Sequence, residues 1–490
     1  MPEGIDAAVE AVFRPAARAL SELVFFSIPV GGAELPLIVL WLIAAASFFT
    51  LYFRFINLRG FGHALWLVRS GSRDAAAPGE VSPFQALSTA VSGTVGVGNV
   101  AHVAIAVSVG GPGALFWLVL AGLLGMSTKF VECALAVRYR EIDAEGRVTG
   151  GPMFYLHRGL AELGWPRLGR GLALYYSVCI VFGCLGIGSM FQSNQAYVQL
   201  LEVTGGAESI LAGRGWLVGS VLALLVALVI LGGIRSIARV TAKLVPLMAA
   251  LYIAMALVVI GANLERLPGA VAAIVSGAFS PQGVTGGFVA VMVLGFRRAA
   301  FSNEAGIGSA AIAHSAVRTR EPITEGFVAL LEPFIDTVVI CSLTGLVITL
   351  TLPDPTAAPP GLSGVELTSA SLASVVPWFP VLLALVVALF AFSTMISWSY
   401  YGLTGWLYLF GRSRRARTTY NTIFCLSVIV GCSTQLEAVL DFSDALVFAM
   451  AFANVVALYA LAPGLKRDLD AYWTRVVAAR ERGARGPGPA

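Results

Sequence analysis

Long hydrophobic segments separated by short polar stretches follow one another along the chain from residue 34 onward. A helix needs roughly 20 apolar residues to cross a hydrocarbon core of about 30 Å, so the pattern predicts an all-α integral membrane protein. The segment 417–434 is the weakest of the predicted spans, because it is short and contains Thr418, Thr419, Asn421 and Thr422. We predict eleven transmembrane helices, at 34–53, 83–110, 113–137, 171–201, 214–234, 238–261, 284–314, 324–351, 376–409, 417–434 and 438–462.

The first 33 residues follow a different pattern. Residues 5–26 mix apolar positions with Glu10, Arg14, Arg18 and Glu22, which is typical of an amphipathic stretch lying at a membrane surface. They lack the compact basic, apolar and small-residue order of a cleavable signal. We therefore expect 1–33 to form an interfacial segment ahead of the first span.

Composition supports a membrane environment. Of 490 residues, 57% are hydrophobic and only 12% are charged, whereas a soluble domain has about 25% charged residues, and the mean hydropathy is +0.82. The net charge of +4 informs topology and does not indicate a nucleic-acid partner. The six cysteines lie in apolar runs without CxxC or Cys/His spacing, so we interpret them as reduced core residues.

Lys and Arg are distributed unevenly over the loops between the predicted spans. Alternate loops and the tail 463–490 hold 25 of the 32 basic residues, whereas the opposite side has only Arg14, Arg18, Arg214 and Arg266. Cytoplasmic loops carry this excess, so we predict an external N-terminus and a cytoplasmic C-terminus in a bacterial or archaeal cell membrane. A miscount of one span would destroy the alternation.

Two predicted spans contain a glycine-rich polar stretch in their middle, SGTVGVGN at 92–99 and FSNEAGIGS at 301–309. Glycine costs roughly 1 kcal/mol per residue in a helix interior, so both stretches favour an unwound backbone. Such backbone is tolerated at membrane depth only where it is buried in protein or lines a cavity. Close packing of two helices through small residues is the alternative for either stretch taken alone.

The two stretches also match each other. GVGNVA at 96–101 and GIGSAA at 306–311 share a pattern and lie 210 residues apart. Five spans in 81–262 and five in 284–462 each open with a broken helix, and because five is odd the second set must enter the membrane from the opposite side. We therefore predict a five-plus-five inverted repeat, the arrangement of many secondary transporters, with 34–57 as an extra peripheral helix.

Several blocks between about 84 and 402 resemble the signatures of one transporter family, the alanine or glycine:cation symporters. They are GTVGVGNVAHVAIAVSVGGPGALFWLVLAGLLGMSTKFVECALAVRYRE, GGPMFYLHRGL, RRAAFSNEAGIGSAAIAHSA, EPFIDTVVICSLTGLVI and FAFSTMISWSYYG. The family is similar in fold to the leucine-transporter group and generally couples sodium to alanine or glycine uptake. The resemblance therefore implies a sodium symporter for small neutral amino acids, with no organic cofactor.

A zwitterionic substrate needs donors for its carboxylate and acceptors for its ammonium group. Free amides at Gly96, Gly98 and Asn99 could hold the carboxylate, and carbonyls near Thr94 and Gly96 could serve a cation. The carbonyls of Phe301 and Ser302 could accept from the ammonium group. Family resemblance marks Asn99, Gln192 and Trp398 as substrate contacts, with Trp398 as a bulky wall that excludes large side chains. Without it, Gln192 could equally form a hydrogen bond between helices.

The span 376–409 carries hydroxyls at Ser393, Thr394 and Ser397, the first and last one helical turn apart. They could bind a hard cation through oxygen or simply bond back to their own helix. In the leucine-transporter group the eighth core helix supplies such hydroxyls to a sodium ion held against the first broken helix. By our count this is the eighth core helix.

Charged residues inside the spans have two interpretations. Glu304 could touch substrate or pair with Arg297 and Arg298, and we expect pairing or gate contacts for Lys129 with Glu132 and for Glu332 with Asp336. Two positions depart from the family pattern, His102 and Ala299, where we expect small residues or glycine. His102 could titrate near neutral pH or only fill space.

Three other functions are compatible with a membrane protein: a proton-coupled transporter, a channel and an enzyme. A proton-coupled transporter of the same fold remains the alternative, whereas a channel would more naturally repeat its filter across subunits. No HExxH, GxSxG or facing acid or histidine pair indicates an enzyme. Oligomeric state does not follow from the sequence.

Overall fold

The computed structural model describes residues 14–477 except 16, 31–32, 71–75, 280–286, 353–363 and 434–436. Helices make up most of these residues, and two short antiparallel hairpins, β1–β2 and β3–β4, are the strands recorded among them. Up to residue 149 the elements are β1 Ser27–Val30, β2 Ala33–Pro36, α2 Leu37–Tyr52, α3 Ile56–Arg59, α4 Phe61–Ser70, α5 Pro83–Thr94, α6 Gly98–Gly110, α7 Gly113–Arg138, β3 Glu141–Ile142 and β4 Val148–Thr149.

The rest of the chain contains several long helices interrupted by π-helical turns. They begin with α8 Pro152–Phe154, η1 Tyr155–Gly159, α9 Leu160–Glu162, α10 Pro166–Leu185, η2 Gly186–Phe191, α11 Gln192–Val203, η3 Gly206–Glu208, α12 Gly215–Ile230, α13 Gly233–Ala262, η4 Leu264–Arg266 and α14 Leu267–Phe279. The remainder are α15 Gly287–Asn303, α16 Ala310–His314, α17 Pro322–Ala329, α18 Leu331–Pro333, η5 Phe334–Cys341, α19 Ser342–Thr351, α20 Val365–Ala373, α21 Phe379–Phe410, α22 Arg414–Ser433, α23 Glu437–Tyr472 and η7 Trp473–Val477.

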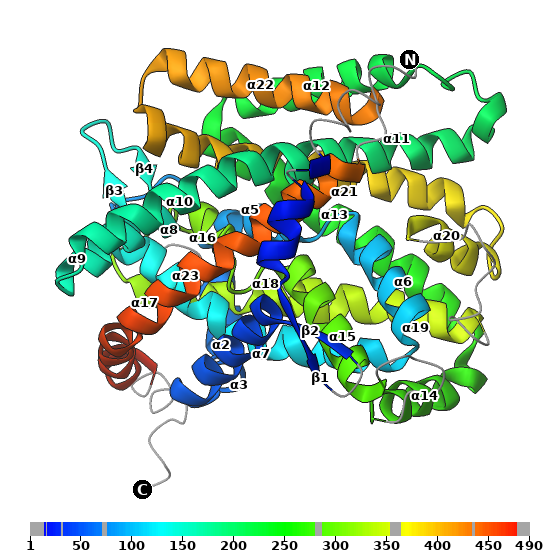
Figure 1. Cartoon of the computed structure of the whole chain (residues 1–490), viewed down its shortest axis with the longest axis horizontal. Coiled ribbons are helices and arrows are strands. Elements are labelled where there is room, and N and C mark those ends of the chain that lie inside the picture. Colours follow the sequence, from blue (N-terminus) through cyan, green and yellow to red (C-terminus); the bar gives the residue numbers. More distant parts are fainter. Residues whose placement is uncertain are drawn as a thin grey trace, which may run out of the picture.

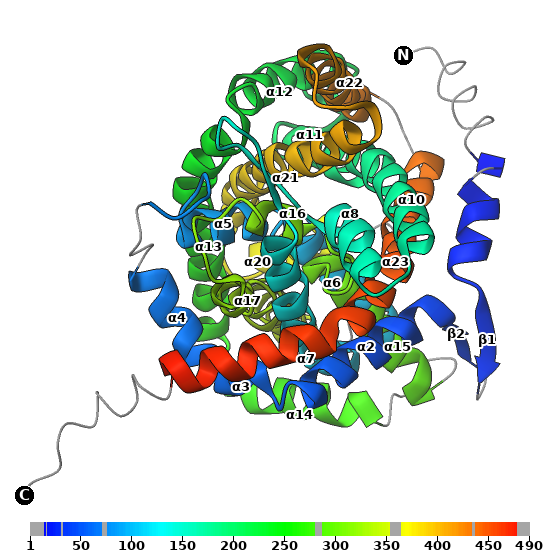
Figure 2. The ribbon, with the colours of Figure 1, turned by 90° about the vertical axis from the view of Figure 1, so that its left-hand side faces the viewer.

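The helices form one bundle with the two broken helices inside it. Figure 1 shows α12 and α22 side by side along one edge, while α21 crosses the middle of the molecule. Seen from the side, α6 and α16 lie in the interior, and α12, α22, α10, α2 and α14 lie around them (Figure 2). The short halves on either side of each break are therefore enclosed by longer, continuous helices.

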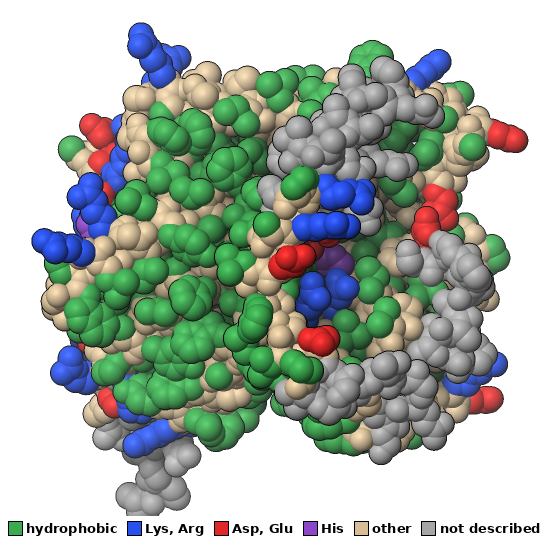
Figure 3. Space-filling view, in the orientation of Figure 1, with side chains coloured by type: hydrophobic (Ala, Val, Ile, Leu, Met, Phe, Trp, Pro, Cys, Tyr) green, Lys and Arg blue, Asp and Glu red, His purple; other side chains and the backbone are tan. Residues whose placement is uncertain are grey.

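Length and hydropathy mark six of the described helical stretches as able to cross a membrane, or seven if the bent pair α5 and α6 is one span. Two apolar helices, α2 and α12, are shorter than that test requires. Large apolar side chains such as Leu224, Leu228 and Leu257 are exposed on the outside of the bundle, and hydrophobic side chains are spread over the left half of the face in Figure 3. An apolar outer surface of this extent suits lipid.

The first and the last helix differ in their bounds from the predicted spans. The first helix begins at Leu37 and not at 34, because Ser27–Val30 and Ala33–Pro36 pair as a hairpin. The last helix runs through Pro463 to Tyr472, ten residues beyond the predicted end at 462. Proline lacks only the N–H that would bond one turn back, so a helix packed on its neighbours can pass through it. The weak segment 417–434 is a helix, α22.

Several described helices were not predicted, and two of them pack against α7 and α6. One is α14, whose Ala278 carbonyl accepts a hydrogen bond from Trp117 Nε1 at 2.9 Å. The other is α20, where Thr368 Oγ1 donates to the Val100 carbonyl at 3.1 Å. Both are only 13 and 9 residues long, which is too short for a search based on membrane-crossing length. The amphipathic prediction for 5–26 falls partly outside the described residues.

Candidate functional site

The first helix break exposes backbone donors inside the bundle. Here α5 ends at Thr94, α6 begins at Gly98, and their axes differ by 45°. Gly96 N–H donates to Asn99 Oδ1 at 2.8 Å, and Asn99 N–H donates to the Gly96 carbonyl at 3.2 Å, so these two amides are not free as predicted. Within the described residues no acceptor is recorded for the N–H groups of Val97 and Gly98. They lie at a helix N-terminus, where unsatisfied amides carry partial positive charge and favour an anion.

The second helix break is filled by the protein itself. Glu304, Gly306 and Gly308 have φ of 55°, 93° and 89°, so the chain is unwound between α15 and α16. Gly306 N–H donates to Glu132 Oε1 at 2.9 Å, and its carbonyl accepts from Asn454 Nδ2 at 2.8 Å. Because side chains from α7 and α23 satisfy this backbone, the second break is a fixed support, in contrast to the open amides of the first.

A buried polar joint connects the two breaks. Asn99 Nδ2 donates to Ser302 Oγ at 3.2 Å and to Asp336 Oδ1 at 2.6 Å. Ser302 Oγ in turn donates to Asp336 Oδ2 at 2.8 Å. All three side chains are buried. The structure thus brings predicted residues Asn99 and Ser302 together and adds Asp336, which the sequence pattern could not place because its partners lie 237 and 34 residues away.

Oxygen atoms gather where the end of α5 meets the middle of α21. Thr394 Oγ1 donates to the Ser92 carbonyl at 3.0 Å, Ser397 Oγ to Ser92 Oγ at 3.0 Å, and Ser92 Oγ to the Ser393 carbonyl at 2.6 Å. This cluster is buried and carries no formal charge. It contains the predicted hydroxyls of Thr394 and Ser397 together with Ser92, which was not predicted. Ser393 contributes its carbonyl, while its hydroxyl donates to the Phe390 carbonyl of its own helix at 3.0 Å.

The hydroxyl of the predicted ligand Thr94 behaves differently. It bonds back to the Ala90 and Val91 carbonyls of its own helix, both at 3.4 Å. Gly96 does face the cluster, since a Cβ built on it would lie 2.8 Å from Thr394 Oγ1. The role of each of these residues as a cation ligand stays a prediction.

Gln192 and Trp398 flank the same break. Gln192 is 4% exposed, its Nε2 donates to the Ile187 carbonyl at 3.3 Å, and its Oε1 has no partner. That oxygen points toward Gly96, from whose built Cβ it would be 3.5 Å away. Trp398 Nε1 donates to the Gly93 carbonyl at 3.0 Å. Gln192 directly follows the π-helical turn η2, and Asp336 lies in the π-helical turn η5. Such turns often occur at functional sites.

Phe301 forms part of an aromatic group beside the break. Its ring lies edge-on to the imidazole of His102, with 4.3 Å between ring centroids, and the other face of His102 stacks near Phe191 at 5.7 Å. No backbone donor is recorded among the described residues for the carbonyls of Phe301 and Ser302. The predicted acceptors are therefore available at the end of α15.

Buried charges pair across helices and not along them, which corrects the expected pairing of Lys129 with Glu132 and of Glu332 with Asp336. Lys129 Nζ lies 3.0 Å from Glu332 Oε1, and both side chains are 0% exposed. Glu332 Oε2 lies 3.7 Å from His314 Nε2. Asp336 instead belongs to the joint between the breaks.

The expected pairing of Glu304 with the two arginines is also not what the structure records. Glu304 accepts a short hydrogen bond from Ser309 Oγ. Arg297 lies over the Phe25 ring at 4.3 Å and, with Arg298, interacts electrostatically with Asp444. Glu304 directly follows α15, the helix that carries both arginines, and its left-handed backbone directs its side chain to Ser309 in the break.

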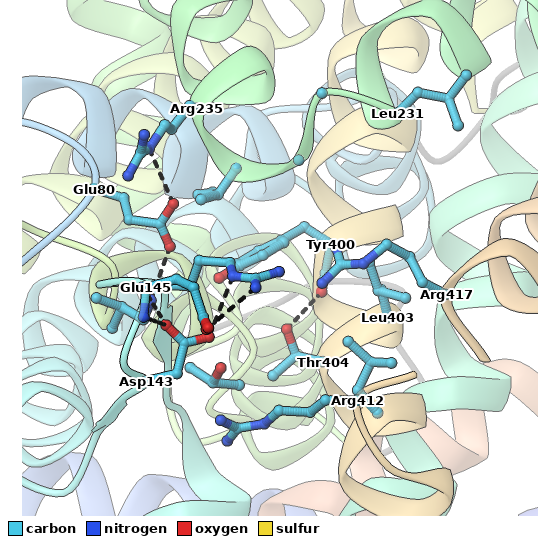
Figure 4. A pocket seen from close by; sticks show the side chains of 17 residues that line it. Glu80, Asp143, Glu145, Leu231, Arg235, Tyr400, Leu403, Thr404, Arg412 and Arg417 are labelled. Carbon is cyan, nitrogen blue, oxygen red and sulfur yellow. Dashed lines mark hydrogen bonds and ion pairs between the residues drawn. The ribbon is translucent and has the colours of Figure 1, made fainter. Parts of the chain in front are cut away.

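A separate cavity of about 650 Å³ lies further along α21. Figure 4 shows Tyr400, Leu403 and Thr404 of α21 on one side of it and Glu80, paired with Arg235, on another. Its lining contains none of the predicted site residues. Tyr401, the neighbour of the lining residue Tyr400, is fully buried and reaches the first break, where a Cβ built on Gly93 would lie 2.9 Å from its hydroxyl.

A bundle of membrane-length helices with two broken helices that meet at a buried polar centre defines a secondary transporter. The model of the sodium:alanine symporter family matches residues 28–484. The chain belongs to this family, whose members are transporters and not enzymes.

Relatives support the assignment over most of the chain. The sodium/alanine symporter AgcS of Methanococcus maripaludis is 36% identical over 441 residues, which is 89% of this chain and 94% of the relative. The probable sodium/glutamine symporter GlnT of Bacillus subtilis is 32% identical, over 91% and 89% of the two chains. The crystal structure of MhsT in complex with L-phenylalanine covers 77% of this chain and 88% of its own, with a TM-score of 0.53 at 17% identity, a likeness of fold.

Proposed function

We propose that this protein is a sodium-coupled symporter that imports small neutral amino acids such as alanine or glycine by alternating access. One observation carries the proposal: the N–H groups of Val97 and Gly98 have no acceptor among the described residues, and the unpartnered Oε1 of Gln192 points at Gly96, which directly precedes them. Donors for a carboxylate and an acceptor for an ammonium group therefore face one place. A zwitterion satisfies both, and neither requires a charged side chain that would trap the substrate.

Sodium is the proposed co-transported ion, held by the oxygen cluster of Ser92, Ser393, Thr394 and Ser397, with Thr94 and Gly96 as the predicted additional ligands. Hydroxyl and carbonyl oxygens suit hard cations. The absence of a carboxylate among these four residues favours a monovalent ion that must later be released. Membership of the sodium:alanine symporter family supports the same ion.

Substrate contacts follow from the same geometry. We assign the carboxylate to the amides of Val97 and Gly98, because the amides of Gly96 and Asn99 already donate within the break. The ammonium group is assigned to Gln192 and to the carbonyls of Phe301 and Ser302. Trp398, fixed by its bond to the Gly93 carbonyl, limits the space for a side chain. Because a wall excludes a larger group by steric overlap, this favours glycine and alanine over branched amino acids.

For alternating access we propose the inverted repeat 81–262 and 284–462, with 34–57 peripheral, 1–33 external and 463–490 cytoplasmic. The cavity in Figure 4 is lined by Arg147, Arg235, Arg412 and Arg417. These residues belong to the basic-rich segments 138–170, 235–243 and 412–417, which the sequence predicts as loops on one side of the membrane. Such loops face the cytoplasm. We therefore assign the cavity as a cytoplasmic vestibule, with Tyr401 as the barrier between it and the site.

Uptake of labelled alanine into proteoliposomes tests the proposal. We expect accumulation driven by an inward sodium gradient and abolished when the gradient is dissipated. Gln192→Leu should lose uptake, whereas Gln195→Leu, which lies one turn away and bonds to Asn194, should retain it. Accumulation driven only by a proton gradient would instead support the proton-coupled alternative, and passive equilibration would indicate a channel. Failure to transport any amino acid would refute the substrate class.

A further inference from the structure

His102 places a polar atom beside the substrate site that the proposed binding of alanine leaves unused. It lies one turn into α6 and is 8% exposed. Helical side chains point back toward the N-terminus of their helix, and the imidazole accordingly covers the first turn of α6: a Cβ built on Gly98 would lie 3.3 Å from His102 Nδ1. The ring is held between Phe191 and Phe301.

His102 Nδ1 is buried and has no hydrogen-bond partner among the residues that the structure describes. Buried polar atoms are nearly always paired, because an unpaired one loses its hydration without compensation. Gln192 Oε1, the other unpartnered atom at this break, is directed at Gly96. Two unsatisfied side-chain atoms on two different helices thus converge on the segment that also presents the free amides of Val97 and Gly98.

A bound amino acid is the group able to satisfy all of them at once. Its carboxylate takes the amides and its ammonium group takes Gln192 Oε1, which leaves His102 Nδ1 for the side chain. Alanine and glycine have no polar side-chain atom, so with either substrate Nδ1 stays unpaired. A side-chain hydroxyl both donates and accepts, so it can pair with Nδ1 whichever tautomer the imidazole adopts.

We propose that the preferred substrate of this transporter is a small amino acid with a side-chain hydroxyl, of which serine is the smallest, and that His102 Nδ1 binds this hydroxyl. The inference rests on the proposed function and narrows its substrate class. The aromatic rings of Phe191 and Phe301 hold the imidazole in place, so His102 is a specificity-determining residue and not a mobile one.

Competition for labelled alanine uptake in proteoliposomes tests the inference. For the unaltered protein, we expect serine to compete about tenfold more strongly than unlabelled alanine, the ratio that one unpaired buried polar group costs. His102→Leu keeps a bulky side chain without the polar atom and should reduce the ratio to about one or below. His102→Asn retains a polar atom near the Nδ1 position and should keep part of the preference.

Because each ratio compares two competitors on one variant, low expression or partial misfolding does not alter it. His157→Leu is the matched control: it removes a histidine that bonds to Tyr408, away from the breaks, and should keep the full preference. An unchanged ratio in His102→Leu, or no preference in the unaltered protein while alanine is still transported, would overturn the inference alone. Absence of uptake for every amino acid would overturn the proposed function with it.

Discussion

The buried ion pair between Lys129 and Glu332 allows a quantitative prediction. Its atoms are 3.0 Å apart, and neither side chain is exposed. Removing one partner from such a pair typically costs 3–5 kcal/mol, because the remaining charge keeps its desolvation penalty and loses its counterion. For Lys129→Met we expect a loss of about 4 kcal/mol in the free energy of unfolding, since Glu332 would retain only the more distant His314 as a cationic neighbour among the contacts recorded.

A double substitution separates this explanation from simple loss of packing. In Lys129→Met with Glu332→Met no charge of the pair is left, so we expect at least half of the lost free energy to return. The exposed pair of Arg138 and Asp468 provides the control on the same helix, with side chains 35% and 47% exposed. Arg138→Met should cost less than about 1 kcal/mol.

Denaturant titration of the purified protein in detergent, followed by tryptophan fluorescence, measures all four free energies under one set of conditions. Equal destabilisation by Lys129→Met and Arg138→Met would show that burial does not raise the cost as argued. A double variant less stable than Lys129→Met would refute the unpaired charge as the cause.

Three further substitutions address the site. Thr394→Ala removes a hydroxyl from the oxygen cluster and should raise the sodium concentration for half-maximal uptake at least about tenfold. Thr404→Ala, on the same helix but bonded only to the Tyr400 carbonyl among the contacts recorded, should leave this concentration unchanged. Equal effects of the two substitutions would argue against the cluster as the sodium site. Asn99→Ala removes the hydrogen bonds that connect the two helix breaks through Ser302 and Asp336, and it should abolish uptake. Normal transport by this variant would contradict the prediction. Gly306→Ala forces a side chain onto φ of 93° with its Cβ 2.4 Å from Leu42 Cδ2, and thermal melting should show a loss of stability.

Much of the fold was predictable because it depends on local pattern. A helix in lipid satisfies its backbone N–H and C=O groups by hydrogen bonds within itself, so the length of an apolar segment identifies it without tertiary information. The helix breaks at 95–97 and 304–309 were predictable for a related reason, since clustered Gly, Ser and Asn disfavour a helix. Prediction was less successful for α14 and α20 and for the end of α23, where packing of neighbouring segments and not length decides the helix bounds.

The residues of the candidate site were also predicted only in part. Residues in or next to a recognisable run, such as Asn99 and Thr394, were predicted from the sequence and its family resemblance, and the tertiary structure places them at the two sides of the first break. Ser92 was overlooked within its run, since no local signal distinguishes its hydroxyl from that of Thr94, which bonds to its own helix.

Pairing between distant side chains was decided by the tertiary structure alone. The sequence suggested Lys129 with Glu132, three residues apart, but Lys129 pairs with Glu332, 203 residues away. Asp336 likewise faces Asn99 across 237 residues. Hydrophobic pattern and backbone propensity are properties of neighbouring residues, so a single sequence contains them; the partner of a buried charge depends on how helices pack, because electrostatic and hydrogen-bond energies depend on distance in space and not along the chain.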